Sequence, residues 1–218
     1  YALDHLGKHA KEGFHLCDRV HCQAYHNMLR YTPDIGEAVS STEDLIMIGP
    51  ELKLAKSFFF ANCGGQTSES DFVWNTAVSY CRSVKDTFCL HSRQATWTKK
   101  ISKSNWRNYL VNQFGYPEND SLLGSLMYNF NQPNRDAFYH VPHLGIPLRD
   151  LRTKFKLKST WFDCHAEGGN VVLDGKGFGH GVGLCQEGAM KMADLGYSYE
   201  QILYFYFTDV QLFDYFHW

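Results

Sequence analysis

Glycine occupies every odd position of residues 175–183, with larger side chains at the even positions. Because side chains alternate across an extended chain, one face of this segment is expected to be bare backbone, with Phe178, His180 and Val182 on the other. A face without Cβ atoms lets a ligand lie on backbone N–H and C=O groups, which suits a polar polymer such as a sugar chain. His180 would then be a positioned donor, acceptor or proton carrier among apolar neighbours.

Glycine-rich segments also occur in two known types of phosphate-binding loop, but the glycine spacing of residues 175–189 matches neither type. The patterns G-x-x-x-x-G-K-S/T and G-x-G-x-x-G do not fit this segment. A second interpretation stays open, namely a glycine-rich strand needed only for tight packing against a helix, with His180 as a hydrogen-bonded core histidine.

A second group of residues has the chemistry of a metal site. Cys17, His21 and Cys22 supply two thiolates and one imidazole within six residues, and His9 lies upstream. Zinc takes four such ligands in a tetrahedron, and closed four-ligand sites are structural. His21 and Cys22 are adjacent and would point apart in a strand, so both can bind one ion only from a turn. Alternative fourth ligands are His15 and His5. Two reduced or bridged cysteines without a metal are the other interpretation.

The seven cysteines form an odd set and not the even framework of a small disulfide-rich scaffold. Cys81 and Cys89 would form a bridge in an exported protein, or both would be plain buried thiols. The sequence leaves both alternatives open.

The composition is that of a globular protein, with 44% apolar residues in 218. The net charge of −2, with both signs interspersed, disfavours nucleic acid and anionic membrane surfaces as partners. No run reaches the roughly 20 apolar residues that a membrane-spanning helix needs. The 16% of aromatic residues suits either an aromatic core or a surface that stacks on ring-shaped ligands.

The elements expected in the N-terminal half are short. Residues 1–10 show helical spacing, with Gly13 as a stop. Residues 44–56 predict two strands turned at Gly49, and residues 57–61 continue the second strand. Residues 92–115 show helix-like spacing.

The C-terminal half is patterned more clearly. Residues 148–155 are basic and amphipathic, and two strands at 159–163 and 170–174 flank the Gly168-Gly169 turn. A helix is expected from Cys185 to Leu195, followed by a last helix behind the capping-box spacing Ser198-x-x-Gln201. We therefore predict a single α+β domain over residues 1–218, with short antiparallel β-hairpins and packed helices around a glycan-binding groove.

Three segments resemble the SpoIID/LytB family, whose members act on peptidoglycan glycan strands. Residues 177–189 resemble its signature G-x-G-H-G-V-G-M/L-S-Q-x-G-A, with Cys185 where the signature has Ser. Residues 59–67, with the downstream Val73-Trp74, are similar to its F-x-A-x-S/C-G-G-x-T element. Residues 17–25 resemble the C-x-x-x-H-C-Q-x-Y element of the sporulation branch. Residues 149–162 also match, so the resemblance extends to about residue 210.

The resemblance implies a peptidoglycan lytic transglycosylase with a zinc bound in the segment 9–22, and it assigns roles to the matched residues. The expected metal ligands are His9, Cys17, His21 and Cys22. The residues expected to contact the sugar are Cys63, Gly64, Gly65, Gln66, Thr67, Gly179, His180, Gly181 and Gln186.

The catalytic group of the family is a glutamate on a helix before the segment that resembles Tyr1-Ala-Leu. We therefore expect this acid upstream of residue 1, and the chain to lack the N-terminal part of its domain. Glu69 and Glu187 are carboxylates within the matched motifs, but neither is where the family places its acid.

Two other functions stay open, a glycan-binding module without turnover and an activator of a cell-wall amidase. A zinc peptidase is disfavoured, because the sequence contains no H-E-x-x-H motif. The expected substrate implies an exported protein, in the periplasm or on the wall side of the cytoplasmic membrane.

Overall fold

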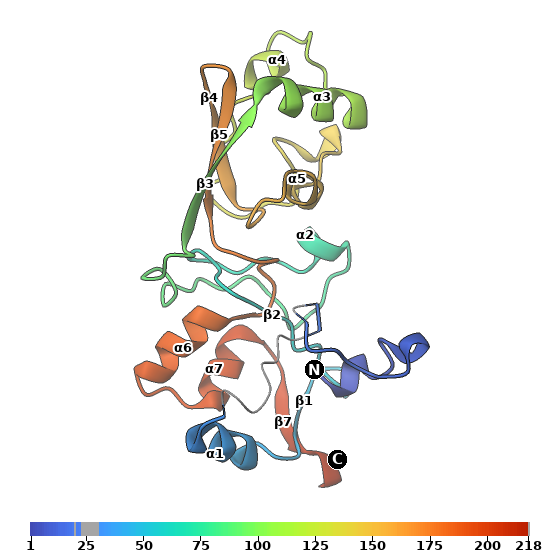
Figure 1. Ribbon diagram of the computed structural model, residues 1–218, viewed down its shortest axis with the longest axis vertical. Helices are drawn as coiled ribbons and strands as arrows, with labels where there is room; N and C mark the ends of the chain where they lie inside the picture. Colours follow the sequence, from blue (N-terminus) through green and yellow to red (C-terminus); the bar gives the residue numbers. More distant parts are fainter. Residues whose placement is uncertain (20, 23–30, 218) are drawn as a thin grey trace. The chain divides into compact units, whose positions relative to one another are not determined.

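The computed structural model describes residues 1–19, 21, 22 and 31–217. The chain divides into two compact units, one made of Tyr1–Phe58 with Asp209–Trp218 and the other of Phe59–Thr208. Helices and small, mostly antiparallel sheets occur together, which confirms the predicted α+β class (Figure 1).

The first unit contains one α-helix and one small sheet among its described residues. Helix α1 (Pro33–Ser41) begins at Thr32, whose side chain accepts a hydrogen bond from the Ile35 N–H. Strand β1 (Leu45–Ile48) pairs antiparallel with β7 (Gln211–Asp214), so segments more than 160 residues apart form one two-stranded sheet. A 3-10 turn, η5 (Tyr215–His217), follows β7.

The helix predicted for residues 1–10 is wrong. The segment forms two short 3-10 turns, η1 (Leu3–His5) and η2 (Ala10–Glu12), and Gly7 between them has a φ of +82°. Leu3 and Leu6, which set the helical pattern, are 41% and 57% exposed, so no core holds them in a helix. Gly13 does end the second turn, with a φ of +88°.

The hairpin predicted at residues 44–56 is only half formed. The first strand is β1, but the return segment makes a single bridge between Ile48 and Leu54. The continuation forms β2 (Phe59–Phe60), whose partner is the distant β6 (Leu184–Cys185) in parallel orientation.

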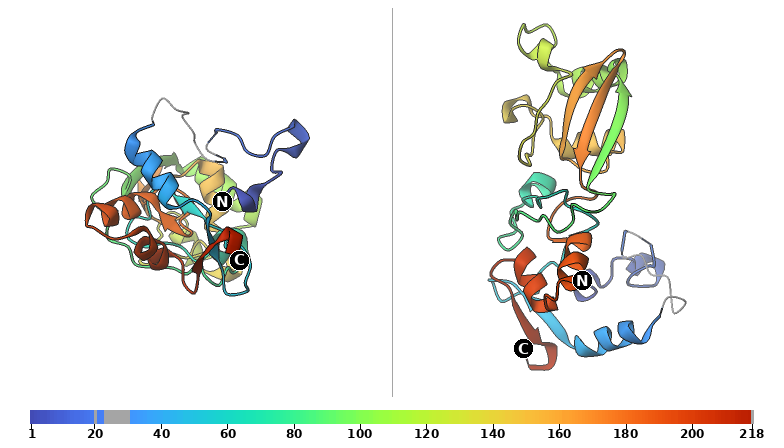
Figure 2. Two further views of the ribbon diagram at one scale, coloured as in Figure 1. Left: turned by 90° about the horizontal axis from the view of Figure 1, so that it is seen from below. Right: turned by 90° about the vertical axis from the view of Figure 1, so that its left-hand side faces the viewer.

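The second unit is built on a three-stranded antiparallel sheet in the order β3-β5-β4. Its strands are β3 (Thr96–Ser102), β4 (Phe162–Glu167) and β5 (Asn170–Lys176). Helices α3 (Lys103–Phe114) and α5 (Leu148–Phe155) cover one face of this sheet, and Figure 2 shows its open face in the right-hand view. The core between sheet and helices is aromatic and aliphatic, and includes Trp97, Trp106, Leu110, Leu151, Phe162 and Leu173.

The sequence predicts this part well, with one correction. Helix α5 has the bounds of the amphipathic segment, and the β4–β5 hairpin is confirmed. Residues 92–115 are not one helix, because β3 precedes α3 and Ser102 caps the helix with its side chain. In β3 the buried residues alternate, which is the strand pattern.

The remaining elements of the second unit lie around the β2–β6 pair and in the connections. Helix α6 (Gln186–Asp194) follows β6, and α7 (Tyr199–Tyr206) begins with the predicted capping box of Ser198 and Gln201. The connections contain the short helices α2 (Asp71–Trp74) and α4 (Leu123–Leu126) and the 3-10 turn η4 (Pro142–Leu144).

Candidate functional site

The two segments that carry the glycine-rich motifs lie side by side in the second unit. Strands β2 and β6 pair directly, and Asn62 and Phe178 exchange two backbone hydrogen bonds of 3.0 and 2.7 Å. Further along, the Ser68 N–H donates to the Gly181 carbonyl at 2.7 Å. Segments more than 100 residues apart in the sequence therefore form one structural element.

The glycines of residues 177–183 are needed for backbone conformation and close packing. Gly177, Gly179, Gly181 and Gly183 all have positive φ, between +78° and +124°. A Cβ atom on Gly177 would lie 2.6 Å from the Asn62 carbonyl oxygen. The segment is not the extended strand that its alternation predicts, because left-handed glycines alternate with ordinary residues and turn the chain.

The expectation that one face of this segment is bare backbone, open to a ligand, is also wrong. The N–H groups of Gly177 and Gly179 donate to the carbonyls of Ala95 and Lys158, and Phe178 bonds to Asn62. These polar groups therefore bind neighbouring protein segments, and the interpretation as a tightly packed glycine-rich segment is the one that the geometry favours. The structure itself does not show a glycan-binding groove here.

His180 is held by the backbone through both ring nitrogens. Its Nδ1 lies 3.1 Å from the Val182 nitrogen, and its Nε2 lies 3.0 Å from the Phe59 oxygen. Burial lowers the pKa of His180 to about 4, so the ring is neutral at physiological pH. The Val182 N–H requires an acceptor at Nδ1, which leaves the proton on Nε2 to be donated to Phe59.

An aromatic face surrounds His180. Its ring packs against Trp74 and Phe60, with centroid distances of 5.2 and 5.4 Å. Trp74 and Phe178 are 38% and 42% exposed, which is high for large aromatic side chains, and Lys158 lies 5.8 Å over the Phe178 ring. We call Trp74 and His180, together with the exposed Phe178 two residues before His180 in the chain, the aromatic face.

A buried arginine holds the turn that the first motif forms. Arg135 donates from Nε to the Gln66 carbonyl at 2.7 Å and from a terminal nitrogen to the Cys63 carbonyl at 2.8 Å. Burial lowers the pKa of Arg135 to about 10, so it stays cationic at neutral pH. No sequence motif pointed to Arg135, because the signal depends on the fold.

The two motif carboxylates bind protein groups. Glu187 accepts from the amides of Gln94 and Asn62 at 2.6 and 2.5 Å. Glu69 accepts from the Ser83 N–H at 3.1 Å. Both carboxylates therefore organise the loops around the motifs.

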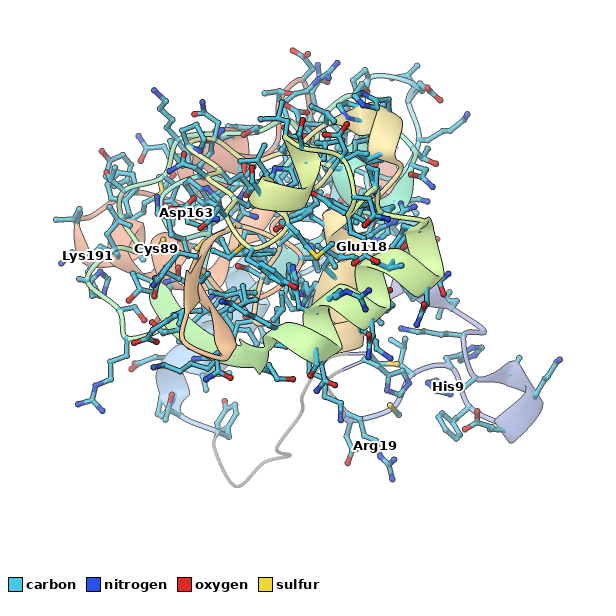
Figure 3. All side chains as sticks on the ribbon, turned by 90° about the horizontal axis from the view of Figure 1, so that it is seen from above. His9, Arg19, Cys89, Glu118, Asp163 and Lys191 are labelled. Carbon is cyan, nitrogen blue, oxygen red and sulfur yellow. The ribbon has the colours of Figure 1, made fainter. Side chains whose placement is uncertain are left out.

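Four metal-binding side chains come together in the first unit. His9, Cys17, His21 and Cys22 place their ligand atoms within 4.8 Å of one another. The Nε2 atoms of His9 and His21 are 3.0 Å apart, and His9 Nε2 is 3.3 Å from Cys22 Sγ. Such spacings fit the edges of a zinc tetrahedron, about 3.3 Å between nitrogens and about 3.6 Å between nitrogen and sulfur. The cluster, with His9 labelled in Figure 3, could therefore hold a metal ion.

The surroundings of this cluster favour His9 as the fourth ligand over the alternative His15. His21 and Cys22 lie in a turn, as ligation by both requires. Glu12 lies 3.1 Å from His9 Nδ1 and can accept its proton, which directs Nε2 to the cluster. His15 accepts from Gly7 instead of joining the group. The motif residues Val20, Gln23, Ala24 and Tyr25 lie outside the described residues.

Comparison with known proteins supports the resemblance. No family model matches the chain. Stage II sporulation protein D of Bacillus amyloliquefaciens is 31% identical over 82% of this chain, and that of Bacillus subtilis is 27% identical over the same share. The chain is SpoIID-like. It spans about half the length of these relatives, 50% of each.

Two other relatives extend the comparison of the SpoIID-like chain. An uncharacterised protein of Brachyspira hyodysenteriae is 29% identical over 99% of the chain and 58% of its own length. An amidase enhancer of Bacillus subtilis is 36% identical over 74% of the chain and 30% of its own length. The names of the characterised relatives refer to sporulation and to the enhancement of an amidase.

The structure brings the residues predicted to contact sugar into one region of the SpoIID-like chain, but at different depths. Five of them reach the surface at least partly, namely Gly65, Gln66, Gly179, His180 and Gln186. Four are buried, namely Cys63, Gly64, Thr67 and Gly181. The Thr67 hydroxyl accepts from the Val84 N–H at 2.7 Å, so it organises a loop.

Sequence reasoning did not include three residues of this region among the site residues. Trp74 was noted only as part of a motif, and Asp86 and Arg135 gave no local signal.

Among the described residues, no helix has the length and apolar character needed to cross a membrane.

Proposed function

We propose that the chain is the glycan-holding part of a peptidoglycan lytic transglycosylase of the SpoIID type. The observation that carries this proposal is the aromatic face, where both motifs meet. Exposed aromatic rings offer flat apolar surface to sugar rings, and Gln66 and Gln186 of the same two motifs, which are at least partly exposed, offer polar groups. Likeness to two sporulation proteins D supports the same assignment.

The proposed reaction cleaves the bond between N-acetylmuramic acid and N-acetylglucosamine without water. One acid protonates the leaving oxygen and then, as a carboxylate, accepts the proton of the muramic 6-hydroxyl, which attacks the anomeric carbon to give a 1,6-anhydro sugar. A second carboxylate is not needed, in contrast to ordinary glycosidases. In this proposal the acid is the family glutamate, on the segment that precedes the match to Tyr1.

The part of this chain in the reaction is to hold and orient the strand. Fixing the reacting sugar in a productive position is itself a large contribution to rate. Residues Gly65, Gln66, Gly179 and Gln186 reach the surface at least partly and are proposed to contact the sugar, while Cys63, Gly64, Thr67 and Gly181 are buried and shape the backbone of the two motifs. His180 fixes the shape of the face through its two backbone hydrogen bonds.

The cluster of His9, Cys17, His21 and Cys22 is proposed to hold a structural zinc. A zinc with four protein ligands has no open position for substrate and stabilises the local fold. The segment around it has only 3-10 turns among its described residues, so it depends on such a cross-link.

Product analysis tests the proposed reaction. Purified sacculi are digested with the natural protein that carries this chain, and the products are weighed by mass spectrometry. The proposal expects muropeptides ending in 1,6-anhydro-N-acetylmuramic acid, which are one water lighter than hydrolysis products. Reducing ends instead would mean a hydrolase, and strand binding without products would mean a binding module.

Activation of a cell-wall amidase is the second candidate, favoured by the likeness to an amidase enhancer. It predicts faster release of stem peptides by a purified amidase when the chain is added, without 1,6-anhydro products. Both candidates act on peptidoglycan, so we propose that the protein is exported, to the periplasm or the wall side of the cytoplasmic membrane.

A further inference from the structure

A second group of metal-binding side chains lies in the interior of the second unit. Cys63, Asp86, Cys89 and Cys185 place their ligand atoms within 4.8 Å of one another, and all four residues are 0% exposed. They come from three separate parts of the chain: the turn after β2, the loop 86–89, and β6. The SpoIID signature has Ser at the position of Cys185, so the resemblance does not imply this group.

The distances between these ligand atoms suit a tetrahedral ion. Sγ of Cys63 lies 3.3 Å from both Sγ of Cys89 and Oδ2 of Asp86. With zinc–sulfur bonds of about 2.3 Å, the sulfur atoms of a tetrahedral site are about 3.8 Å apart, and sulfur and oxygen are about 3.6 Å apart. A small adjustment of the side chains therefore completes the tetrahedron. All seven cysteines are free thiols, so no disulfide competes in this structure.

Backbone N–H groups point at two of the sulfur atoms and would stabilise their thiolates once a metal ion is bound. Backbone N–H groups of Cys63 and Gly188 both point at Cys185 Sγ, at 3.3 and 3.4 Å, and the Gly65 N–H points at Cys63 Sγ at 3.4 Å. Cys185 is also the N-cap of helix α6, where the helix dipole stabilises negative charge. N–H donors to sulfur are the outer contacts that metal-bound thiolates use.

Asp86 is the residue that a metal-free interior explains least well. Its carboxylate accepts from three neutral donors, the Phe88 N–H at 2.9 Å, the Tyr206 hydroxyl at 2.7 Å and the Cys63 thiol at 3.3 Å, but makes no ion pair with a basic side chain in the described part of the chain. A buried carboxylate without a cation in contact with it is costly. A divalent ion bound by Asp86 and the three sulfurs supplies that cation.

We propose that Cys63, Asp86, Cys89 and Cys185 form a second, closed zinc site, which joins the two glycine-rich motifs. Zinc displaces the three thiol protons to solvent and leaves a four-coordinate ion with no open position, so its role is structural. The resulting net charge of −2 is balanced in part by the buried Arg135, which binds the Cys63 carbonyl. The β2–β6 pair spans only two residues, so a metal cross-link here holds a part of the unit that has little regular structure.

The zinc content of purified variants tests this proposal separately from the site at His9. Wild-type protein is expected to contain two zinc ions per chain by mass spectrometry of the metal, and Cys17→Ser with Cys22→Ser is expected to keep one. Adding Cys185→Ser to that pair should remove the remaining ion. Serine still caps α6, so this variant is expected to fold. Cys81→Ser, a buried thiol outside the group, is the matched control and should keep both ions.

Two further measurements test whether sulfur atoms bind the metal and whether a disulfide forms instead. Cobalt substituted into the Cys17 and Cys22 double variant should give sulfur-to-cobalt charge transfer and strong visible bands, both lost with Cys185→Ser. A double variant that is folded but free of zinc would overturn the second site. Alkylation in denaturant without reductant should modify every cysteine. Cys63 and Cys89 left without label would show a disulfide between them, which would also overturn the second zinc site.

Discussion

The Nδ1 atom of His180 accepts a hydrogen bond from the backbone N–H of Val182, with the two nitrogens 3.1 Å apart. This contact fixes the tautomer, because the ring proton must then lie on Nε2, which is 3.0 Å from the Phe59 oxygen. Both nitrogens are thus used to hold the glycine-rich segment on β2. We infer that His180 positions the aromatic face and does not transfer a proton to the glycan.

The neutral state of His180 predicts a pH dependence of stability. Burial lowers its pKa to about 4 in the folded chain, against an ordinary value of 6.5, so the unfolded chain binds the proton more tightly. The contribution to stability is complete above pH 6.5 and is lost as the pH falls toward 4, by at most about 3 kcal/mol. Urea unfolding of wild type and His180→Gln should show free energies that converge across this range. A constant difference would contradict the assignment.

Two glycine substitutions separate backbone conformation from close packing. Gly177 and Gly196 have φ of +78° and +89°, but only a Cβ on Gly177 meets protein atoms. Gly196→Ala should cost about 1–2 kcal/mol, as for other residues in the left-handed region. Gly177→Ala should cost about 1–3 kcal/mol more, because its Cβ lies 2.6 Å from the Asn62 oxygen. Equal losses in chemical denaturation would mean that the segment is not tightly packed.

Glu187→Gln should reduce stability without removing glycan binding. The carboxylate accepts two side-chain amide hydrogen bonds, from Asn62 and Gln94, and a glutamine can accept only one of them well. The expected loss is about 1–3 kcal/mol in urea unfolding. Glu51→Gln, an exposed control, should change it little. Unchanged stability together with lost activity would point to a catalytic role for Glu187 instead.

Glu12→Gln tests the proposed zinc site at His9 without removing a ligand. Glu12 accepts from His9 Nδ1 at 3.1 Å and so keeps Nε2 directed at the cluster. Loss of such an outer contact typically weakens metal binding by about 10- to 100-fold. Competition with a chromogenic chelator should show this for Glu12→Gln and not for the control Glu43→Gln, an exposed glutamate outside the cluster. The same affinity in both variants would exclude Glu12 as an orienting residue.

The sequence predicted correctly those helices that are determined by residues close together in the chain. The amphipathic segment of α5 and the capping box at Ser198 need only neighbouring residues, and both are confirmed. The pattern at Leu3 and Leu6 failed because no core buries it. The alternating glycines misled for another reason: an extended strand and a chain of left-handed turns give the same spacing, and only the neighbouring segment distinguishes them.

Side-chain groups were predicted where a motif was continuous and were missed where the fold assembles them from distant segments. The structure brings His9 together with Cys17, His21 and Cys22, which lie close in sequence, and their role as metal ligands stays a prediction. Asp86 and Cys89 have no such local context, since their partners Cys63 and Cys185 are distant in the chain. The single domain that we predicted over residues 1–218 stays a prediction, as does the groove.

The account is tested most directly by calorimetric titration of the protein with peptide-free peptidoglycan glycan strands. Trp74→Ala and Phe178→Ala should each weaken binding about tenfold or more, a loss of about 1.4 kcal/mol, because each removes a ring of the aromatic face. Tyr204→Ala, an aromatic residue of α7 with 48% exposure, should bind as wild type does. Strand binding that survives loss of Trp74 and Phe178 together, or wild-type protein that binds no strand, would contradict the account.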